Sequence, residues 1–283
     1  MKIKDLHTVS QIASRDWLIL QNAIPRLVSS ISQIPEPAQL AEIEIDDFFE
    51  LRPESKMDDA NIAEIHVHNA LVDTCPAIYE KLGMVTRYET IRSEIDSAIE
   101  SGAEGIMFVM DSPGGTVSGN VELSQYVMEL AVPTVTFARG LCCSAAYKIA
   151  AGTDKIIASP SASVGNIGTI LSWVNMEEFW ASMGVRFEAL TSEGADLKST
   201  FHTEPNETQR QFLQDGIDES GRQFRDHVIA GRAAAGKEVD DEVWRAGWYS
   251  GEKAGSLGLV DGIGSIELAR EELLNLIDKK NQL

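Results

Sequence analysis

A serine lies at the expected junction between a strand and a helix in residues 134–170. Residues 134–138 alternate and are β-branched, which favours a strand, and Arg139-Gly140 interrupts the pattern. The segment Ser144 to Ala151 (SAAYKIAA) is rich in small helix formers. Ser144 is therefore expected in the first turn of a helix, where an oxygen faces unpaired backbone N–H groups and the positive end of the helix dipole. A hydroxyl group there is either a helix cap or a nucleophile.

A glycine-rich turn follows an apolar strand in the DSPGG motif of residues 111–115. The apolar run of residues 105–109 before it is typical of a buried strand. Two glycines at the end of such a strand let backbone N–H groups approach a ligand closely, as an oxyanion hole requires. The motif therefore shifts the interpretation of Ser144 from a cap towards a nucleophile.

Three motifs in this order, DSPGG, the serine turn and SPSASVGNIG at residues 159–168, resemble the signal peptide peptidase A family of serine/lysine peptidases. The resemblance extends over about residues 62–264. It implies an α/β chain with the Clp/crotonase-like fold of repeated β-β-α units. It implies no cofactor and no metal.

The resemblance also implies roles for individual residues. Ser144 is the expected nucleophile, and the backbone N–H groups of Gly114 or Gly115 and of Ala145 are expected to hold the oxyanion. Many relatives have a serine at the position of Asn166 that helps to hold the catalytic lysine. Asn166 keeps an acceptor oxygen and is expected to position the lysine here.

A serine nucleophile needs a base, and either histidine or lysine can supply one. His202 is the only histidine that follows the serine near a plausible site loop, and no recognisable acid orients it. Lowering a lysine pKa from ~10.4 to ~7 requires roughly 4.6 kcal/mol, so a lysine base must be substantially buried. Lys148 lies one helical turn after Ser144. Lys198, in the loop SEGADLKST, matches the family's general-base lysine, so it is the expected base and Lys148 is the alternative.

The net charge of −20 argues against a nucleic-acid backbone or an anionic membrane surface as the main partner. His66 and His68 alternate along an expected strand at solvent-facing positions. Because no cysteine or acid accompanies them at ligand spacing, no metal site is predicted.

Three cysteines, among them the adjacent pair Cys142 and Cys143, favour a reducing compartment over a disulfide framework. Cys143 beside the serine is an alternative nucleophile, but free cysteine usually packs as a small apolar residue. No apolar run reaches 18 residues and the first residues lack the apolar core of a signal peptide, so we expect a cytoplasmic protein without a membrane anchor.

Residues 1–60 are expected to form an N-terminal helical arm and acidic linker, and residues 61–283 the peptidase domain. Apolar residues recur at helical spacing across residues 8–33, from Trp17 to Ile31. Three prolines and nine acidic residues then mark the linker before Asn61.

Periodicity predicts strands and helices in alternation within the domain, which implies crossover units around a mostly parallel sheet. The predicted helices lie around residues 91–99, 123–130, 176–183 and 213–228. The predicted strands include residues 62–68, 105–110 and 185–191.

These features predict an ATP-independent serine endopeptidase that acts on protein or peptide substrates and forms a homo-oligomer. The missing anchor and the acidic appendage are most similar to head-maturation proteases of tailed phages, which process scaffold or capsid proteins in the host cytoplasm. A soluble signal-peptide-peptidase-like protease is the nearest alternative. Two further alternatives are an inactive capsid assembly protein and an enzyme with acyl-thioester chemistry of the crotonase type.

Overall fold

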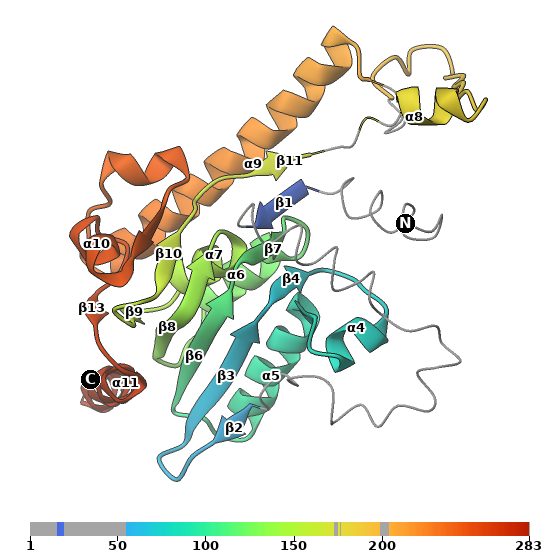
Figure 1. Cartoon of the computed structure of the whole chain (residues 1–283). Coiled ribbons are helices and arrows are strands. Elements are labelled where there is room, and N and C mark those ends of the chain that lie inside the picture. The colour runs from blue at the N-terminus through green and yellow to red at the C-terminus, as the bar shows by residue number, and fades with distance from the viewer. Residues whose placement is uncertain (1–15, 20–54, 173–174, 176, 199–203, 283) are drawn as a thin grey trace.

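A mostly parallel sheet forms the centre of the computed structural model, which describes residues 16–19, 55–172, 175, 177–198 and 204–282 (Figure 1). Its long parallel strands are β3 (Ile62–His68), β6 (Gly105–Ser112) and β8 (Thr134–Cys143). Strands β9 (Lys155–Ala158) and β10 (Ser163–Gly165) both run parallel to β8. Shorter strands complete the sheet: β2 (Lys56–Met57), β12 (Trp248–Ser250) and β13 (Gly262–Ile263).

Two of the central strands lead into a strand of a second sheet and then into a helix. β3 is followed by β4 (Ala70–Val72), α4 (Ala77–Lys81), β5 (Val85–Arg87) and α5 (Tyr88–Glu100). β6 is followed by β7 (Gly114–Thr116) and α6 (Asn120–Met128). The second sheet has the order β11 (Ile170–Leu171), β1 (Asp16–Ile19), β7, β4, β5. These β-β-α units confirm the predicted Clp/crotonase-like α/β fold.

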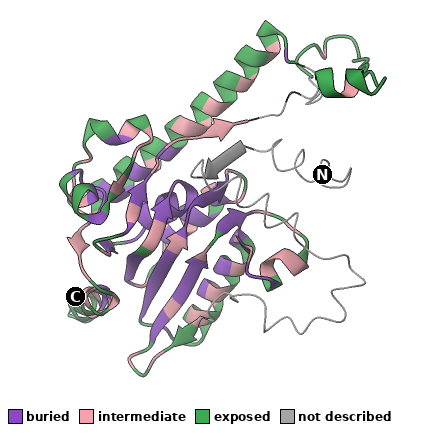
Figure 2. Ribbon diagram, viewed as in Figure 1, coloured by how far each residue is buried: buried purple, intermediate pink, exposed green. Residues whose placement is uncertain are grey.

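Helices cover both faces of the main sheet, and α7 (Ala145–Ala151) is buried along its whole length (Figure 2). On one face α5, α6, α7 and α9 (Glu207–Ala234) enclose the larger apolar core. On the other face α11 (Ile266–Asn281) packs on β6, β8 and β9. Helix α9 approaches α7 so closely that a Cβ atom on Gly231 would lie 1.8 Å from the Ala151 carbonyl oxygen. Only glycine fits at that position.

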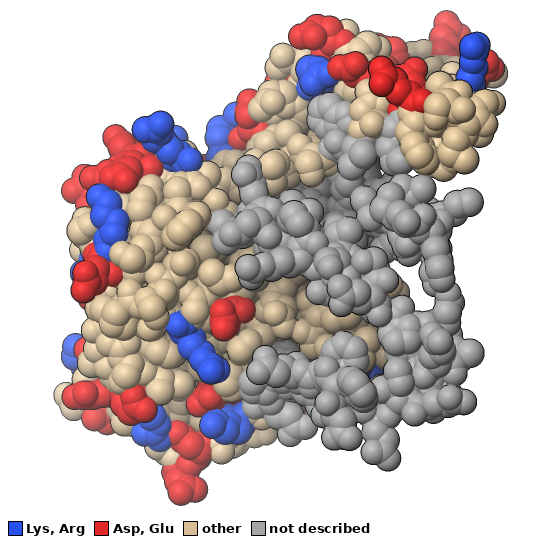
Figure 3. Space-filling model, in the orientation of Figure 1, with Lys and Arg blue, Asp and Glu red and all other residues tan. Residues whose placement is uncertain are grey.

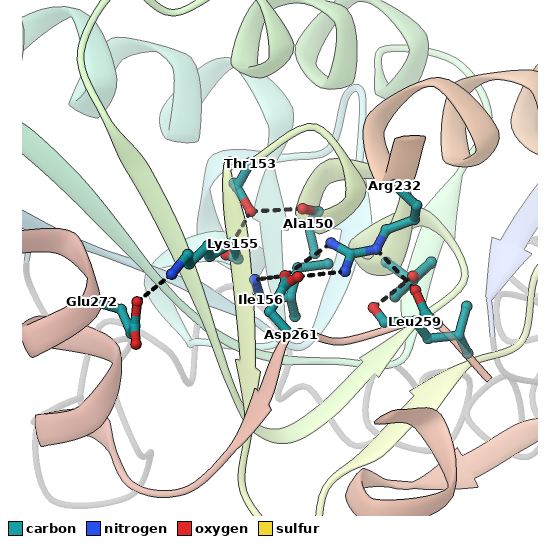
Figure 4. Close-up of polar contacts among 10 residues, drawn as sticks. Ala150, Thr153, Lys155, Ile156, Arg232, Leu259, Asp261 and Glu272 are labelled. Carbon is teal, nitrogen blue, oxygen red and sulfur yellow. Dashed lines mark hydrogen bonds and ion pairs between the residues drawn. The ribbon is translucent and has the colours of Figure 1, made fainter. Parts of the chain in front are cut away.

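A buried ion pair fastens the C-terminal part of α9 to the sheet (Figure 4). The fully buried Arg232 guanidinium donates to both carboxylate oxygens of Asp261, at 3.0 and 2.9 Å. The same carboxylate accepts the Ile156 N–H of β9 at 2.7 Å. Removing one partner is expected to be strongly destabilising, because it leaves the other charge buried and uncompensated. This network fixes α9 against β9 and so holds α9 beside α7.

Two predicted elements differ from the structure. Residues 16–19 form the strand β1 instead of part of a helix, because they pair with two strands far away in the sequence. The rest of the predicted N-terminal helical arm and most of the predicted linker lie outside the described residues. The predicted strand at residues 185–191 is irregular and largely exposed, since this segment projects away from the sheet together with α8 (Glu177–Ser182) (Figure 1).

Two smaller predictions are also wrong. Strand β8 continues through Arg139-Gly140, because the Leu141 N–H is bound by Asp111 Oδ1 on the neighbouring strand at 2.9 Å. His66 is buried instead of solvent-facing, with its Nε2 2.9 Å from Glu64 Oε1.

The remaining C-terminal elements are the short helices η2 (Asp241–Arg245) and α10 (Gly251–Ser256). Within the described part of the chain, no helix is both long enough and apolar enough to cross a membrane.

Candidate active site

Ser144 stands at a sharp turn between β8 and α7. Its backbone has φ 55° and ψ −119°, which is rarely adopted by residues other than glycine. The Ser144 N–H donates to the Gly165 carbonyl at 2.7 Å, and the Ser144 carbonyl accepts from the Lys148 N–H at 2.9 Å. A strained strand-to-helix turn of this kind presents a reactive serine in other enzymes.

The Ser144 hydroxyl is buried but not engaged. The residue is 1% exposed, and its Oγ has no hydrogen-bond partner among the described residues. It also makes no capping hydrogen bond to its own helix. A buried hydroxyl without a partner costs about 1–3 kcal/mol, which makes Ser144 a candidate for a chemical role.

The DSPGG motif lies beside this turn, and both glycines are required by the backbone. Gly114 has φ 105°, and its N–H donates to Ser112 Oγ at 3.2 Å. A Cβ atom on Gly115 would lie 1.8 Å from the Leu71 carbonyl oxygen of β4. The strand β7 that contains both glycines packs against α7. The predicted oxyanion residues Gly114 and Gly115 are therefore close to the helix of the predicted nucleophile.

Two buried side chains that the sequence did not point to connect these elements. Asn120 is fully buried, and its Nδ2 donates to the carbonyl of Ala145, the third predicted oxyanion residue, at 3.0 Å. The Tyr88 hydroxyl donates to the Thr116 carbonyl at the end of β7 at 2.7 Å. No short motif contains them, so only the tertiary structure reveals that they support the site.

Asn166 follows β10 directly and adopts a positive φ of 56°. Its N–H donates to the Gly247 carbonyl at 2.7 Å, and its Nδ2 donates to the Ala246 carbonyl at 2.8 Å. The preceding residue, Gly165, accepts the hydrogen bond from the Ser144 N–H. Asn166 thus anchors the strand beside Ser144 through its N–H and Nδ2 groups, and its lysine-positioning role stays a prediction.

Lys148 is 2% exposed and lies one turn after Ser144. Its Nζ is 5.8 Å from the centre of the Phe224 ring on α9. Burial lowers the pKa of Lys148 to about 8, although the negative charge of Glu122 opposes the shift. Burial and the charge of Lys148 together lower the pKa of His227 to about 4. Lys148 has the lowered pKa that a base needs, yet it makes no hydrogen bond to Ser144 Oγ.

The pKa of Lys148 predicts a stability that rises with pH. Between about pH 8 and pH 10.5 the unfolded chain keeps the lysine proton and the folded chain loses it, so the free energy of unfolding increases with pH. This increase in the free energy of unfolding is expected to be roughly 3 kcal/mol in the wild type and to be absent in Lys148→Met. Denaturant unfolding at the two ends of this range measures it, with the exposed Lys81→Met as control. The same pH dependence in wild type and Lys148→Met would contradict the assignment.

Lys198 lies far from Ser144 in the chain's own fold. It is exposed, and its carbonyl accepts a hydrogen bond from Gln209 Nε2, near the start of α9, at 3.0 Å. Phe224 faces Lys148 and follows Gln209 by fifteen helical steps, so the two residues of α9 are separated by about 22 Å along the helix axis. The structure therefore brings Ser144 together with the glycine strand and Lys148, but it does not bring Lys198 to Ser144 within one chain.

Residues 177–198 and the first turns of α9, here called the distal arm, expose many apolar side chains. Figure 3 shows a surface over α8 that is mostly neither acidic nor basic, with charged groups of both signs at its border. Leu190 is fully exposed, and other large apolar residues of the arm are about half exposed. These residues are Phe179, Met183, Val185, Phe187, Leu197 and Phe212.

The other sequence candidates differ in their surroundings. Burial raises the pKa of the Cys143 thiol to about 12, and its Sγ donates to the Ser163 carbonyl, so it suits packing better than nucleophilic attack. His202 lies outside the described residues. Within the described ranges, no three His, Cys, Asp or Glu side chains are grouped to hold a metal ion.

Comparisons with known proteins identify the family of the chain. The profile of peptidase family S49 matches residues 129–280, which include Ser144 and the strand of Gly165. The chain is similar to a candidate protease of Synechocystis sp., with 30% identity over 204 residues, which are 66% of this chain and 73% of the relative.

Two further relatives are matched over a smaller share of their length. A candidate protease of Methanocaldococcus jannaschii is 30% identical over 189 residues, 64% of this chain and 59% of the relative. Capsid assembly protease C of Escherichia phage lambda is 26% identical over 203 residues, 71% of this chain and 46% of the relative. This chain therefore spans only part of the length of both relatives. By the family profile and the Synechocystis relative, the chain belongs to peptidase family S49.

Proposed function

We propose that this protein is a serine endopeptidase and that Ser144 is its nucleophile. The observation that carries the proposal is the buried, unpartnered Ser144 hydroxyl at a strained turn beside the glycine strand. A structural serine at a helix start normally caps the helix, and this one does not. Membership of a peptidase family makes a peptide carbonyl the appropriate electrophile.

In the proposed reaction Ser144 Oγ adds to the carbonyl carbon of the substrate while a neutral lysine removes the hydroxyl proton. Backbone N–H groups of Gly114 or Gly115 and of Ala145 stabilise the oxyanion. The lysine then gives its proton to the leaving amine as the C–N bond breaks, and water hydrolyses the acyl-enzyme. In the described structure Ser112 Oγ accepts the Gly114 N–H, and Gly115 lies in β7 opposite Leu18 of β1 and Leu71 of β4.

We propose that the base is Lys198 and that a second copy of the chain supplies it. Lys198 is exposed at the far end of α9, whereas a lysine base has to be shielded from water. The distal arm that carries it also exposes seven large apolar residues, and exposed apolar patches of this kind mark protein interfaces. Docking the arm on a neighbouring copy buries both the patch and the lysine, which supports a homo-oligomer whose interface completes the site.

We further propose that the substrates are capsid or scaffold proteins, on the basis of the similarity to the lambda capsid assembly protease. The head-tail preconnector protein of phage P21 is also similar, with 27% identity over 171 residues. A general peptidase that resembles the signal peptide peptidases is the alternative, and peptide substrate profiling distinguishes the two.

A fluorophosphonate probe that reacts with activated serines tests the proposed function. We expect the probe to modify the folded protein at Ser144 and nowhere else, as mapped by mass spectrometry of peptides. Heat-unfolded protein is the control, because an activated serine depends on the fold. If folded protein under oligomer-forming conditions takes up no probe, the proposal of a serine endopeptidase is refuted.

A further inference from the structure

The strand β1 lies in an unusual place for a segment near the start of the chain. It pairs antiparallel with β7 on one side, with Trp17 opposite Thr116, Leu18 opposite Gly115 and Ile19 opposite Gly114. On its other side it pairs antiparallel with β11. The four-residue strand β1 thus lies between β7 and β11, which do not pair with each other in the described sheet.

This position is not a consequence of local chain geometry. Almost a hundred residues separate β1 from β7, so no hairpin brings the two strands together. Closing such a long loop has an entropic cost, which the pairing with two strands has to offset. Without β1, the facing edges of β7 and β11 would both present unpaired backbone groups, which is the arrangement that binds an extended polypeptide as an added strand.

The position between β7 and β11 that β1 fills is here called the slot, and it leads to the candidate active site. Its β7 edge begins at Gly114 and Gly115, whose N–H groups are expected to serve the oxyanion, and β7 packs against α7, which follows Ser144. The chain of β1 runs from Thr116 towards Gly114, so Ile19 is the described residue of β1 paired nearest the glycine turn. A polypeptide in this register delivers its backbone to the oxyanion residues.

We infer that the slot between β7 and β11 is a binding site for extended polypeptide, and that Asp16–Ile19 is a built-in occupant that competes with substrates for it. This inference rests on the proposed function of Ser144. Recognition is through the main chain, because antiparallel pairing supplies hydrogen bonds whatever the side chains are.

A proline in β1 tests the inference in the full-length chain. Leu18→Pro removes the N–H group from a strand with neighbours on both sides, which weakens its pairing. If the slot is filled in about 90% of molecules, freeing it raises kcat/KM for a peptide substrate, and the rate of fluorophosphonate labelling at Ser144, about tenfold. Leu18→Val keeps the N–H group and strand propensity, and it is expected to behave as wild type.

A synthetic peptide of residues 12–23 gives a second readout that does not depend on the folding of the proline variant. We expect it to inhibit wild-type cleavage competitively, raising KM and leaving kcat unchanged, whereas the peptide with Pro at position 18 does not. Equal labelling in wild type and a folded Leu18→Pro, or no inhibition by the peptide, overturns the occupant while Ser144 labelling still supports the peptidase. No labelling in any variant refutes the proposed function and, with it, this inference.

Discussion

Replacing Ser144 with alanine is expected to lower peptide cleavage by at least about 10³-fold, as removal of the nucleophile does in other serine peptidases. The fold is expected to survive, because Ser144 Oγ makes no hydrogen bond to the described residues and does not cap α7. The thermal midpoint is therefore expected to change by no more than a few degrees. Cleavage of a quenched fluorescent peptide and a thermal melt, measured on the same preparation, check both statements.

Ser124→Ala is the matched control for this change. Ser124 is also fully buried, but its hydroxyl donates to the Val121 carbonyl within α6. Its loss is expected to cost about 1 kcal/mol of stability and to leave cleavage intact. Undiminished cleavage by Ser144→Ala would move the nucleophile elsewhere.

Replacing Lys198 with methionine is expected to reduce cleavage as strongly as Ser144→Ala, because a nucleophile and its base act as a unit. Lys198→Arg should fail too, since a guanidinium does not release its proton in proteins. Because Lys198 is exposed and joined to α9 through its backbone carbonyl, neither change should alter the melting temperature of the isolated chain. Steady-state kinetics of the three proteins at equal concentration measure the effect.

Lys148→Met distinguishes Lys148 from Lys198 as the catalytic base. Its expected effect is on the pH dependence of stability, with cleavage largely retained. If instead Lys148→Met abolishes cleavage and Lys198→Met preserves it, the base lies on the serine's own helix. That outcome is compatible with the lowered pKa of Lys148. The comparison therefore identifies the base whichever of the two variants loses cleavage.

The local elements around the serine could be predicted from sequence because short-range patterns determine them. Small helix formers after Ser144 predict α7, and the apolar run before DSPGG predicts β6. The steric need for Gly115 is a tertiary effect, since it arises from Leu71 on a neighbouring strand. The motif indicated a glycine requirement but not its partner.

The elements that were mispredicted depend on distant contacts. Trp17-Leu18-Ile19 is a continuous apolar run that fits both an amphipathic helix and a central strand. It forms a strand because it pairs with the edges of β7 and β11. The Arg232–Asp261 pair joins residues 29 apart and lies in no recognisable motif. The distance from Lys198 to Ser144 depends on the direction of α9 relative to α7, which no sequence pattern specifies.

The direct test of an active site completed between two copies is complementation between inactive chains. Ser144→Ala and Lys198→Met chains, each inactive alone, are co-expressed, and native mass spectrometry verifies that both occur in the same particle. A site that takes its serine from one copy and its lysine from the next is intact in about a quarter of random pairings, so the mixture should recover about a quarter of wild-type cleavage. Mixed particles with no more activity than either chain alone would contradict a lysine supplied by the second copy.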